Sequence, residues 1–222
     1  MAWLLMALWG GAVLWGAGHP MREKVLRISM ACGLALSMTG QVVLLWLDRQ
    51  LTLQTGLPLH LCGLFGVLSI PMLVWRAPQP LYELSAFLAG PAAAITLLFP
   101  AVMESSRPLM MQLAFLQLHV LVALTPVMLW RAGKPLPTDP RRALVLASGY
   151  LLGVAAFNRA FRTNYLFLSA APAGTPLKWL AAQGGAYYVC ALAMLCMVVF
   201  CLLANAYAKV EAISGSRSAY SP

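Results

Sequence analysis

Apolar residues run along this chain in stretches of about 20, separated by short segments that contain Pro, Arg and Lys. A helix needs about 20 mostly apolar residues to cross the hydrocarbon core of a bilayer. The pattern predicts seven membrane-spanning helices, at residues 2–18, 25–47, 58–75, 80–100, 108–130, 141–161 and 184–207. The expected fold class is therefore all-α: a polytopic seven-transmembrane helix bundle at residues 1–208, followed by a short polar tail at 209–222.

The composition agrees with this pattern and removes several classes of function. Of the 222 residues, 61% are apolar and 9% are charged, whereas about 25% of residues in a soluble domain are charged. The short loops leave no room for a soluble catalytic domain. The net charge of +9 comes from Lys and Arg residues scattered singly along the chain, and a nucleic-acid binder would cluster them. We expect a multi-pass protein of the cell membrane without a nucleic-acid partner.

The distribution of Lys and Arg predicts the orientation of the bundle. One set of loops and the tail carry ten of these residues: Arg22, Lys24, Arg27, Arg76, Arg131, Lys134, Arg141, Arg142, Lys209 and Arg217. The other set carries five: Arg49, Arg107, Arg159, Arg162 and Lys178. Because cytoplasmic loops hold the excess of positive charge, the N-terminus is expected outside and the C-terminus in the cytoplasm. No basic residue precedes the first apolar run, so we expect a retained helix there and not a signal peptide.

Polar side chains inside the predicted spans are the candidates for function, because such residues are expensive in lipid. Most of them lie in the half of the bundle that is expected to face outside. They are Thr39, Gln41, His60, Cys62, Gln112, Gln117, His119, Asn158, Arg159 and Arg162, with Asn164 and Tyr165 directly after the sixth span.

Cys62 and His119 form the best candidate pair of nucleophile and base. His60 is two residues from Cys62, about 200° around a helix, so these two side chains do not share a face. His119 comes from another span, although it lies about 18 Å along its helix and so deeper than Cys62. Gln112 is seven residues before His119 and is expected to share its inward face. The plain alternatives are that His119 only links helices and that Cys62 only packs.

The remaining cysteines suggest neither a metal nor a redox site. Cys32, Cys190, Cys196 and Cys201 lie among Ala, Leu, Met and Val, and no CxxC motif occurs. No Gly-rich nucleotide loop is present either. We therefore expect neither a metal nor a cofactor.

Three blocks of sequence resemble those of the YwaF-like bacterial membrane family, which is related to eukaryotic transmembrane protein 164. They are Leu57-Pro58-Leu59-His60-Leu61-Cys62, Phe115-Leu116-Gln117-Leu118-His119, and Thr163-Asn164-Tyr165-Leu166-Phe167-Leu168 followed by Pro172. The stretch Leu88-Ala89-Gly90, ending in Phe99-Pro100, also resembles the family's fourth helix. The resemblance covers residues 25 to 205.

The resemblance implies a cysteine-dependent acyltransferase that remodels membrane phospholipids, with a fold similar to that of the androgen-induced intramembrane hydrolases. On this chain it implies Cys62 as the nucleophile and His119 as its partner. His60, Asn164 and Tyr165 match motif positions, and Arg162, Gln112 and Gln41 are further candidates for binding a phospholipid or lysolipid substrate.

Several alternatives remain open at this point. The same Cys62–His119 pair would serve a lipid ester hydrolase if water is the acceptor, because the molecule that can reach the acyl-cysteine decides which reaction follows. A small-solute transporter is a second alternative, although no internal repeat supports it, and a non-catalytic scaffold is a third. If Cys62 is not the nucleophile, Thr39 is the next candidate.

Overall fold

The computed structural model describes residues 1–16, 19–75, 77–100, 102–171, 177–183 and 185–218, and within them it contains helices and no strand. Arg76 and Pro172 lie outside these residues. The helices are α1 (Ala2–Gly16), α2 (Pro20–Leu47), α3 (Leu53–Gly56), α4 (Leu61–Val74), α5 (Gln79–Leu84), the π-turn η1 (Ser85–Ala89), α6 (Gly90–Leu98), α7 (Pro108–Arg131), α8 (Arg141–Phe161), the 3₁₀ turn η2 (Tyr165–Phe167), α9 (Leu177–Ala181) and α10 (Gly185–Ser218).

Five helical segments of the described chain are long and apolar enough to cross a membrane. They are α2, the continuous segment α5–η1–α6, α7, α8 and most of α10. α1 and α4 stand where two further spans were predicted, but they are shorter. α4 has 14 residues and is therefore about 21 Å long, less than the ~30 Å of the hydrocarbon core. The helix begins only at Leu61, so Pro58 to His60 are not helical as the predicted span 58–75 required.

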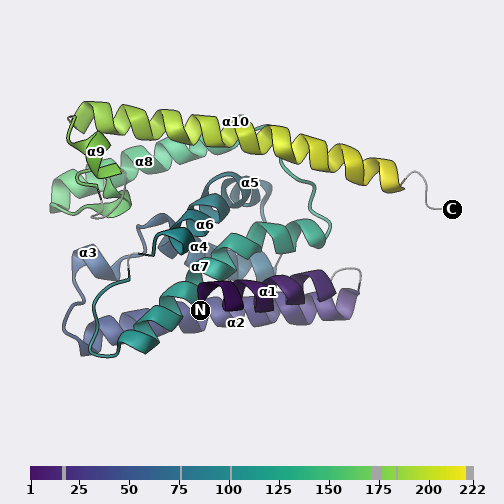
Figure 1. The fold of residues 1–222 in the computed structure, drawn as a ribbon, viewed down its shortest axis with the longest axis horizontal. Coiled ribbons are helices and arrows are strands. Elements are labelled where there is room, and N and C mark those ends of the chain that lie inside the picture. The colour runs from purple at the N-terminus through teal and green to yellow at the C-terminus, as the bar shows by residue number, and fades with distance from the viewer. Residues whose placement is uncertain (17–18, 76, 101, 172–176, 184, 219–222) are drawn as a thin grey trace.

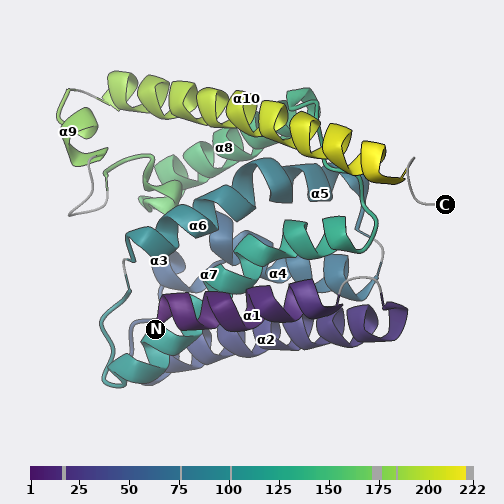
Figure 2. The ribbon, with the colours of Figure 1, turned by 45° about the vertical axis from the view of Figure 1, so that its right-hand side comes forward.

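α7 is the central helix of the bundle, and more of it is buried than of any other long helix described. α1 and α2 lie side by side on one side of it, whereas α8 and α10 form a layer on the opposite side (Figures 1 and 2). The segment α5–η1–α6 lies between the two groups (Figure 2). The main core cluster joins residues of α1, α2, α4, α6 and α7, including Phe65, Ala93 and Leu121.

Two glutamine side chains link α2 and α7 across their interface. Gln41 of α2 donates to the carbonyl oxygen of Ala114 at 3.3 Å, and Gln117 of α7 donates to that of Gly33 at 3.3 Å. Each amide thereby donates a hydrogen bond across the interface, as polar side chains between membrane helices do. The close packing depends on the missing side chain at Gly33, since a Cβ there would lie 2.9 Å from Leu121.

The π-turn η1 has a cause in the sequence. Pro91 follows it and has no backbone N–H, so the helical ladder loses a donor at this point. The N–H of Gly90 bonds to the carbonyl of Ser85, five residues back. Tyr207 of α10 donates to the carbonyl oxygen of Ala86 at 2.8 Å. The irregular turn therefore provides an acceptor that ties α10 to the rest of the bundle.

The C-terminal residues differ from the expected tail. α10 continues through Ser218, so the part of 209–222 that the structure describes is helical and not a loose segment. Glu211 accepts a hydrogen bond from the N–H of Leu136 at 2.5 Å, in the connection between α7 and α8. The helix continues past residue 208 because this contact and Tyr207 hold it against the bundle.

Candidate functional site

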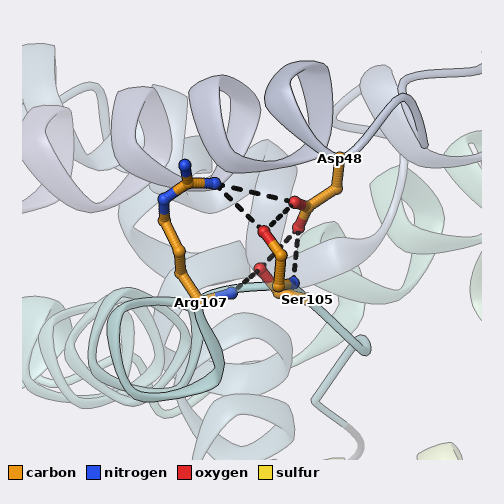
Figure 3. A network of polar contacts seen from close by, with 4 residues as sticks. Asp48, Ser105 and Arg107 are labelled. Atoms are coloured by element: carbon orange, nitrogen blue, oxygen red, sulfur yellow. Dashed lines mark hydrogen bonds and ion pairs between the residues drawn. The ribbon is translucent and has the colours of Figure 1, made fainter.

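A polar network closes one end of the bundle. At the end of α2, the carboxylate of Asp48 accepts hydrogen bonds from the hydroxyl of Ser105 at 2.5 Å and the N–H of Ser106 at 3.1 Å. The Ser106 hydroxyl also donates to it, and the Arg107 guanidinium lies 3.8 Å away (Figure 3). The hydrogen bonds from Ser105 and Ser106, together with the positive charge of Arg107, lower the pKa of Asp48 below its ordinary value. This network holds the connection between α6 and α7 against the end of α2.

Cys62 is the second residue of α4, at the same end of the bundle. His60 is the N-cap residue, and its side chain makes no capping hydrogen bond. The first N–H groups of a helix have no partner within the helix. The backbone N–H groups around Cys62 are therefore donors without intrahelical acceptors, and they carry the partial positive charge of the helix terminus.

The thiol of Cys62 is partly buried against the main core cluster. It lies close to the Thr96 hydroxyl on α6. Thr96 itself donates to the carbonyl oxygen of Ala92 at 2.9 Å. Its oxygen lone pairs therefore remain available to the thiol.

His119 is buried in the middle of α7, with 6% of its surface exposed. Its Nδ1 lies 2.7 Å from the carbonyl oxygen of Phe115, and a carbonyl only accepts, so Nδ1 carries the proton. The neutral ring then keeps a free lone pair on Nε2. The Phe115 ring packs on the imidazole, with centroids 4.1 Å apart, and helps to hold this orientation.

The packing of α6 on α7 brings His119 to about the level of Thr96. A Cβ on Gly90 of α6 would lie 3.0 Å from Pro126 of α7, which aligns the two antiparallel helices at that point. His119 lies seven residues before Pro126, on the same face and about 10 Å along the axis. Thr96 lies six residues after Gly90, about 9 Å in the same direction. Because Cys62 lies close to Thr96, the difference in depth between Cys62 and His119 is smaller than a count of residues along their two helices predicts.

A second group of polar residues lies where α8 ends. Asn158 is buried and organises the loop that follows: its Oδ1 accepts from the Thr163 hydroxyl at 2.8 Å and from the Tyr165 N–H at 2.9 Å. Its Nδ2 donates to the Tyr165 carbonyl at 2.8 Å. The helix itself ends at Arg162, which adopts the left-handed conformation with φ 53°. One amide side chain therefore determines the path of the loop.

This loop holds the segment that leads to Cys62. Tyr165 is buried and its hydroxyl donates to the carbonyl of Leu53. The N–H of Asn164 donates to Oε1 of Gln54 at 2.6 Å. The His60 ring packs against Tyr165, with centroids 5.0 Å apart, and against Phe167, at 5.2 Å. The first and third sequence blocks of the family resemblance are thus in direct contact.

Three of the predicted binding residues, and the alternative nucleophile, have other contacts or positions. The side chain of Asn164 is used within its loop, where Nδ2 donates to Ala170 and Oδ1 accepts from Ser169 and Ala170. Gln41 bonds to the backbone of α2 and α7. Arg162 is exposed at the end of α8. Thr39, the alternative nucleophile, is exposed on α2.

The expectation that Gln112 shares a buried face with His119 is wrong, because Gln112 is exposed. The two residues do share a face of the regular helix. α6, however, ends at Leu98, so it does not extend along α7 as far as Gln112, two turns before His119.

Two residues near the site were missed in the sequence. Thr96 lies beside Cys62, and a Thr within a span gave no distinctive signal. Tyr150 of α8 donates to the carbonyl oxygen of Leu59 at 2.7 Å, directly before His60. Tyr150 lies in the middle of a predicted span, where a buried hydroxyl needs a hydrogen-bond partner. That position could have indicated from the sequence that its hydroxyl has a structural role.

The described residues contain no group of three or more His, Cys, Asp or Glu side chains that could hold a metal ion. A family model, that of the TMEM164 family, matches residues 1–204. The chain belongs to the TMEM164 family. Searches of curated proteins and of solved structures find no match for it. Membership in the TMEM164 family and the five long apolar helices together identify a multi-pass integral membrane protein.

Proposed function

We propose that this member of the TMEM164 family is an intramembrane acyltransferase that acts on acyl esters of membrane phospholipids through an acyl-Cys62 intermediate. One observation carries the proposal: the thiol of Cys62 lies at an uncapped helix N-terminus, beside Thr96, at about the level of the free Nε2 of His119. A thiol nucleophile requires a base to take its proton and donors for the oxyanion that forms on attack.

His119 is the proposed base. Its Nδ1–H is engaged by the Phe115 carbonyl, so the lone pair that accepts the proton is on Nε2. Removal of the proton allows the sulfur of Cys62 to attack the ester carbonyl carbon. The ester C–O bond then breaks, and His119 returns the proton to the leaving lysolipid oxygen.

The backbone N–H groups at the start of α4 are the proposed oxyanion donors. Side chains of Asn164 and Tyr165 are engaged by Ala170 and Leu53 respectively, which makes them poor donors for a reacting ester. The N–H groups of Cys62 and Gly63 have no acceptor within their helix. They lie next to the thiol and need no rearrangement before the reaction, which is what makes such donors effective.

The headgroup of the lipid is proposed to lie at the end of the bundle formed by His60 and Arg162. Arg162 is exposed there and suits a phosphate, which guanidinium groups bind well. With the N-terminus outside and the C-terminus in the cytoplasm, as the charge distribution predicts, this end faces the outer leaflet of the plasma membrane. The acyl chains then enter from the side, out of the bilayer.

The test is lipidomics of membranes that contain the intact protein or its Cys62→Ala variant. The proposal expects new acyl combinations of phospholipids with the intact protein and none with Cys62→Ala. Cys32→Ala is the matched control, because Cys32 is exposed on α2. Equal lipid profiles for Cys62→Ala and the intact protein would refute the proposal.

A further inference from the structure

A seam of buried hydroxyl groups runs between α4 and the antiparallel segment α5–η1–α6. At one end the Cys62 thiol meets Thr96. At the other end Met72 of α4 and Tyr82 of α5 pack in one cluster. These two contacts define how the helices lie against each other.

Ser69 of α4 and Ser85 of η1 lie at about the same level along this seam. Ser69 lies three residues before Met72, and Ser85 lies three residues after Tyr82, so both are one turn closer to Cys62. The neighbours of Ser69 on its own face, Phe65 and Met72, pack into clusters that contain residues of α5 and α6. Ser85 is in turn flanked by Tyr82 and Ala89, which belong to those same clusters.

The hydroxyl groups of Ser69 and Ser85 in the seam, and that of Tyr82 near its end, are buried without a hydrogen-bond partner. Ser69, Ser85 and Tyr82 each have 0% of their surface exposed. Their hydroxyl oxygens form no hydrogen bond with any residue of the described chain. Buried Ser and Thr hydroxyls elsewhere in the bundle do bond: Ser37 donates to Gly33 and Thr125 to Leu121, each at 2.8 Å. Because buried polar groups are nearly always satisfied, an unpartnered group points to a bound molecule.

The chemistry of the seam favours water. Ala89 of η1 and Ala93 of α6, which belong to the same core cluster as Phe65 of α4, are small and fully buried. Hydroxyl groups both donate and accept, and water does the same with several partners. The described residues around the seam offer no cluster of ligands for a metal ion. Ser69 is seven residues from Cys62, on the same face of α4 and about 10 Å away along the helix axis.

We propose that Ser69 and Ser85 bind ordered water in this seam and that the seam supplies water to the acyl group on Cys62. This inference rests on the proposed function, because it concerns the fate of the same intermediate. The water oxygen forms a bond to the thioester carbonyl carbon, and the bond from that carbon to the Cys62 sulfur breaks. His119 takes one proton from the water through Nε2 and returns it to the sulfur. The products are a free fatty acid and the thiol, so the seam makes the protein a hydrolase when no acceptor lipid is bound.

The experiment uses the full chain in lipid nanodiscs, with a phospholipid donor, a lysophospholipid acceptor and ¹⁸O-labelled water. The measured quantity is the ratio of ¹⁸O-labelled fatty acid to acyl groups transferred to the acceptor. Ser69→Val and Ser69→Thr form a matched pair, because the two new side chains have nearly the same shape and only Thr keeps the hydroxyl. We expect Ser69→Val and Ser85→Ala to lower the ratio about threefold or more, whereas Ser69→Thr and the control Ser37→Ala leave it unchanged. An unchanged ratio in both Ser69→Val and Ser85→Ala would overturn the inference.

A second measurement detects the water without any reaction. Radiolytic footprinting oxidises buried side chains that lie next to bound water, so Phe65 and Met72 of the intact protein are expected to be labelled. Ser69→Val is expected to remove that labelling, and Ser69→Thr to keep it. Absence of labelling in the intact protein would overturn the water site even if acyl-Cys62 forms. Labelling with no acyl-Cys62 would instead refute the proposed function, and with it the hydrolytic role of the water.

Discussion

His119 donates from Nδ1 to the carbonyl oxygen of Phe115, one turn earlier in α7, at 2.7 Å. This hydrogen bond selects the tautomer with the proton on Nδ1 and leaves the Nε2 lone pair free. A general base needs such a lone pair. The tautomer is therefore a property of the fold that exists before any substrate binds.

Replacement of His119 tests the role of that lone pair. We expect His119→Ala to slow acyl-Cys62 formation by about 10²- to 10⁴-fold, the usual loss when a general base is removed. Single-turnover labelling with a phospholipid donor measures the rate. His19→Ala is the control, because His19 is exposed and far in sequence from the site. If His119→Ala forms acyl-Cys62 at a rate within about twofold of the intact protein, His119 is a structural residue and not the base.

Asn158 is expected to control the loop after α8. Asn158→Ala leaves the N–H and C=O of Tyr165 and the Thr163 hydroxyl without their partner. We expect this variant to lose about 3 kcal/mol of stability or more, since three buried groups are left unsatisfied and each costs about 1 to 3 kcal/mol. Thermal unfolding in detergent provides the measurement. The exposed neighbour Arg159 supplies the control Arg159→Ala, and equal melting temperatures for the two variants would contradict the role given to Asn158.

Asp48 makes the stability depend on pH in a defined direction. The hydrogen bonds from Ser105 and Ser106 lower its pKa below the ordinary value of 3.8. A carboxylate with a lowered pKa contributes stability above its unfolded pKa, and this contribution is lost as the pH falls through the folded pKa. We expect Asp48→Asn to have a lower melting temperature than the intact protein from pH 5 to 8, and the difference to vanish at pH values well below about 3.8. A difference that stays constant down to the lowest pH would show that the charge is not responsible.

The orientation of the bundle is predicted from the distribution of Lys and Arg, with ten expected on the cytoplasmic side and five on the other. We expect a cysteine introduced at Lys134 to be protected from a membrane-impermeant maleimide in intact cells, and one at Gln50 to be labelled. Cells opened by detergent serve as the control, because both positions are then accessible. Labelling of position 134 in intact cells, with position 50 protected, would reverse the orientation.

The positions of the long helices could be predicted from the sequence because long apolar stretches bounded by Pro and Arg have few other structures in a membrane. The predicted span 141–161 coincides with α8. The late start of α4 could not be predicted, because Leu57 to His60 are mostly apolar. Their path is held by distant parts of the chain: Tyr150 donates to the carbonyl of Leu59, and Tyr165 packs on the His60 ring. Tertiary hydrogen bonds of this kind leave no local pattern.

In the candidate site, too, some features could be predicted from the sequence and others could not. Cys62 and His119 stood out because polar groups are rare in these helices, and both lie in the bundle interior or at its edge. Gln112 was predicted to be buried by helical periodicity alone, but burial also depends on where the neighbouring helix α6 ends. Asn164 looked like a substrate donor, yet its amide completes a turn of its own loop. Whether a polar side chain is free or engaged is decided by contacts that periodicity does not describe.

The central claim is that Cys62 carries the acyl group during the reaction. The most direct test is mass spectrometry of the protein after brief incubation with a phospholipid donor and acid quenching, followed by peptide mapping of all five cysteines. The account predicts an acyl thioester on Cys62, sensitive to neutral hydroxylamine, absent from Cys62→Ala and strongly reduced in His119→Ala. An acyl group on another residue, or turnover of the donor by Cys62→Ala at the rate of the intact protein, would contradict it.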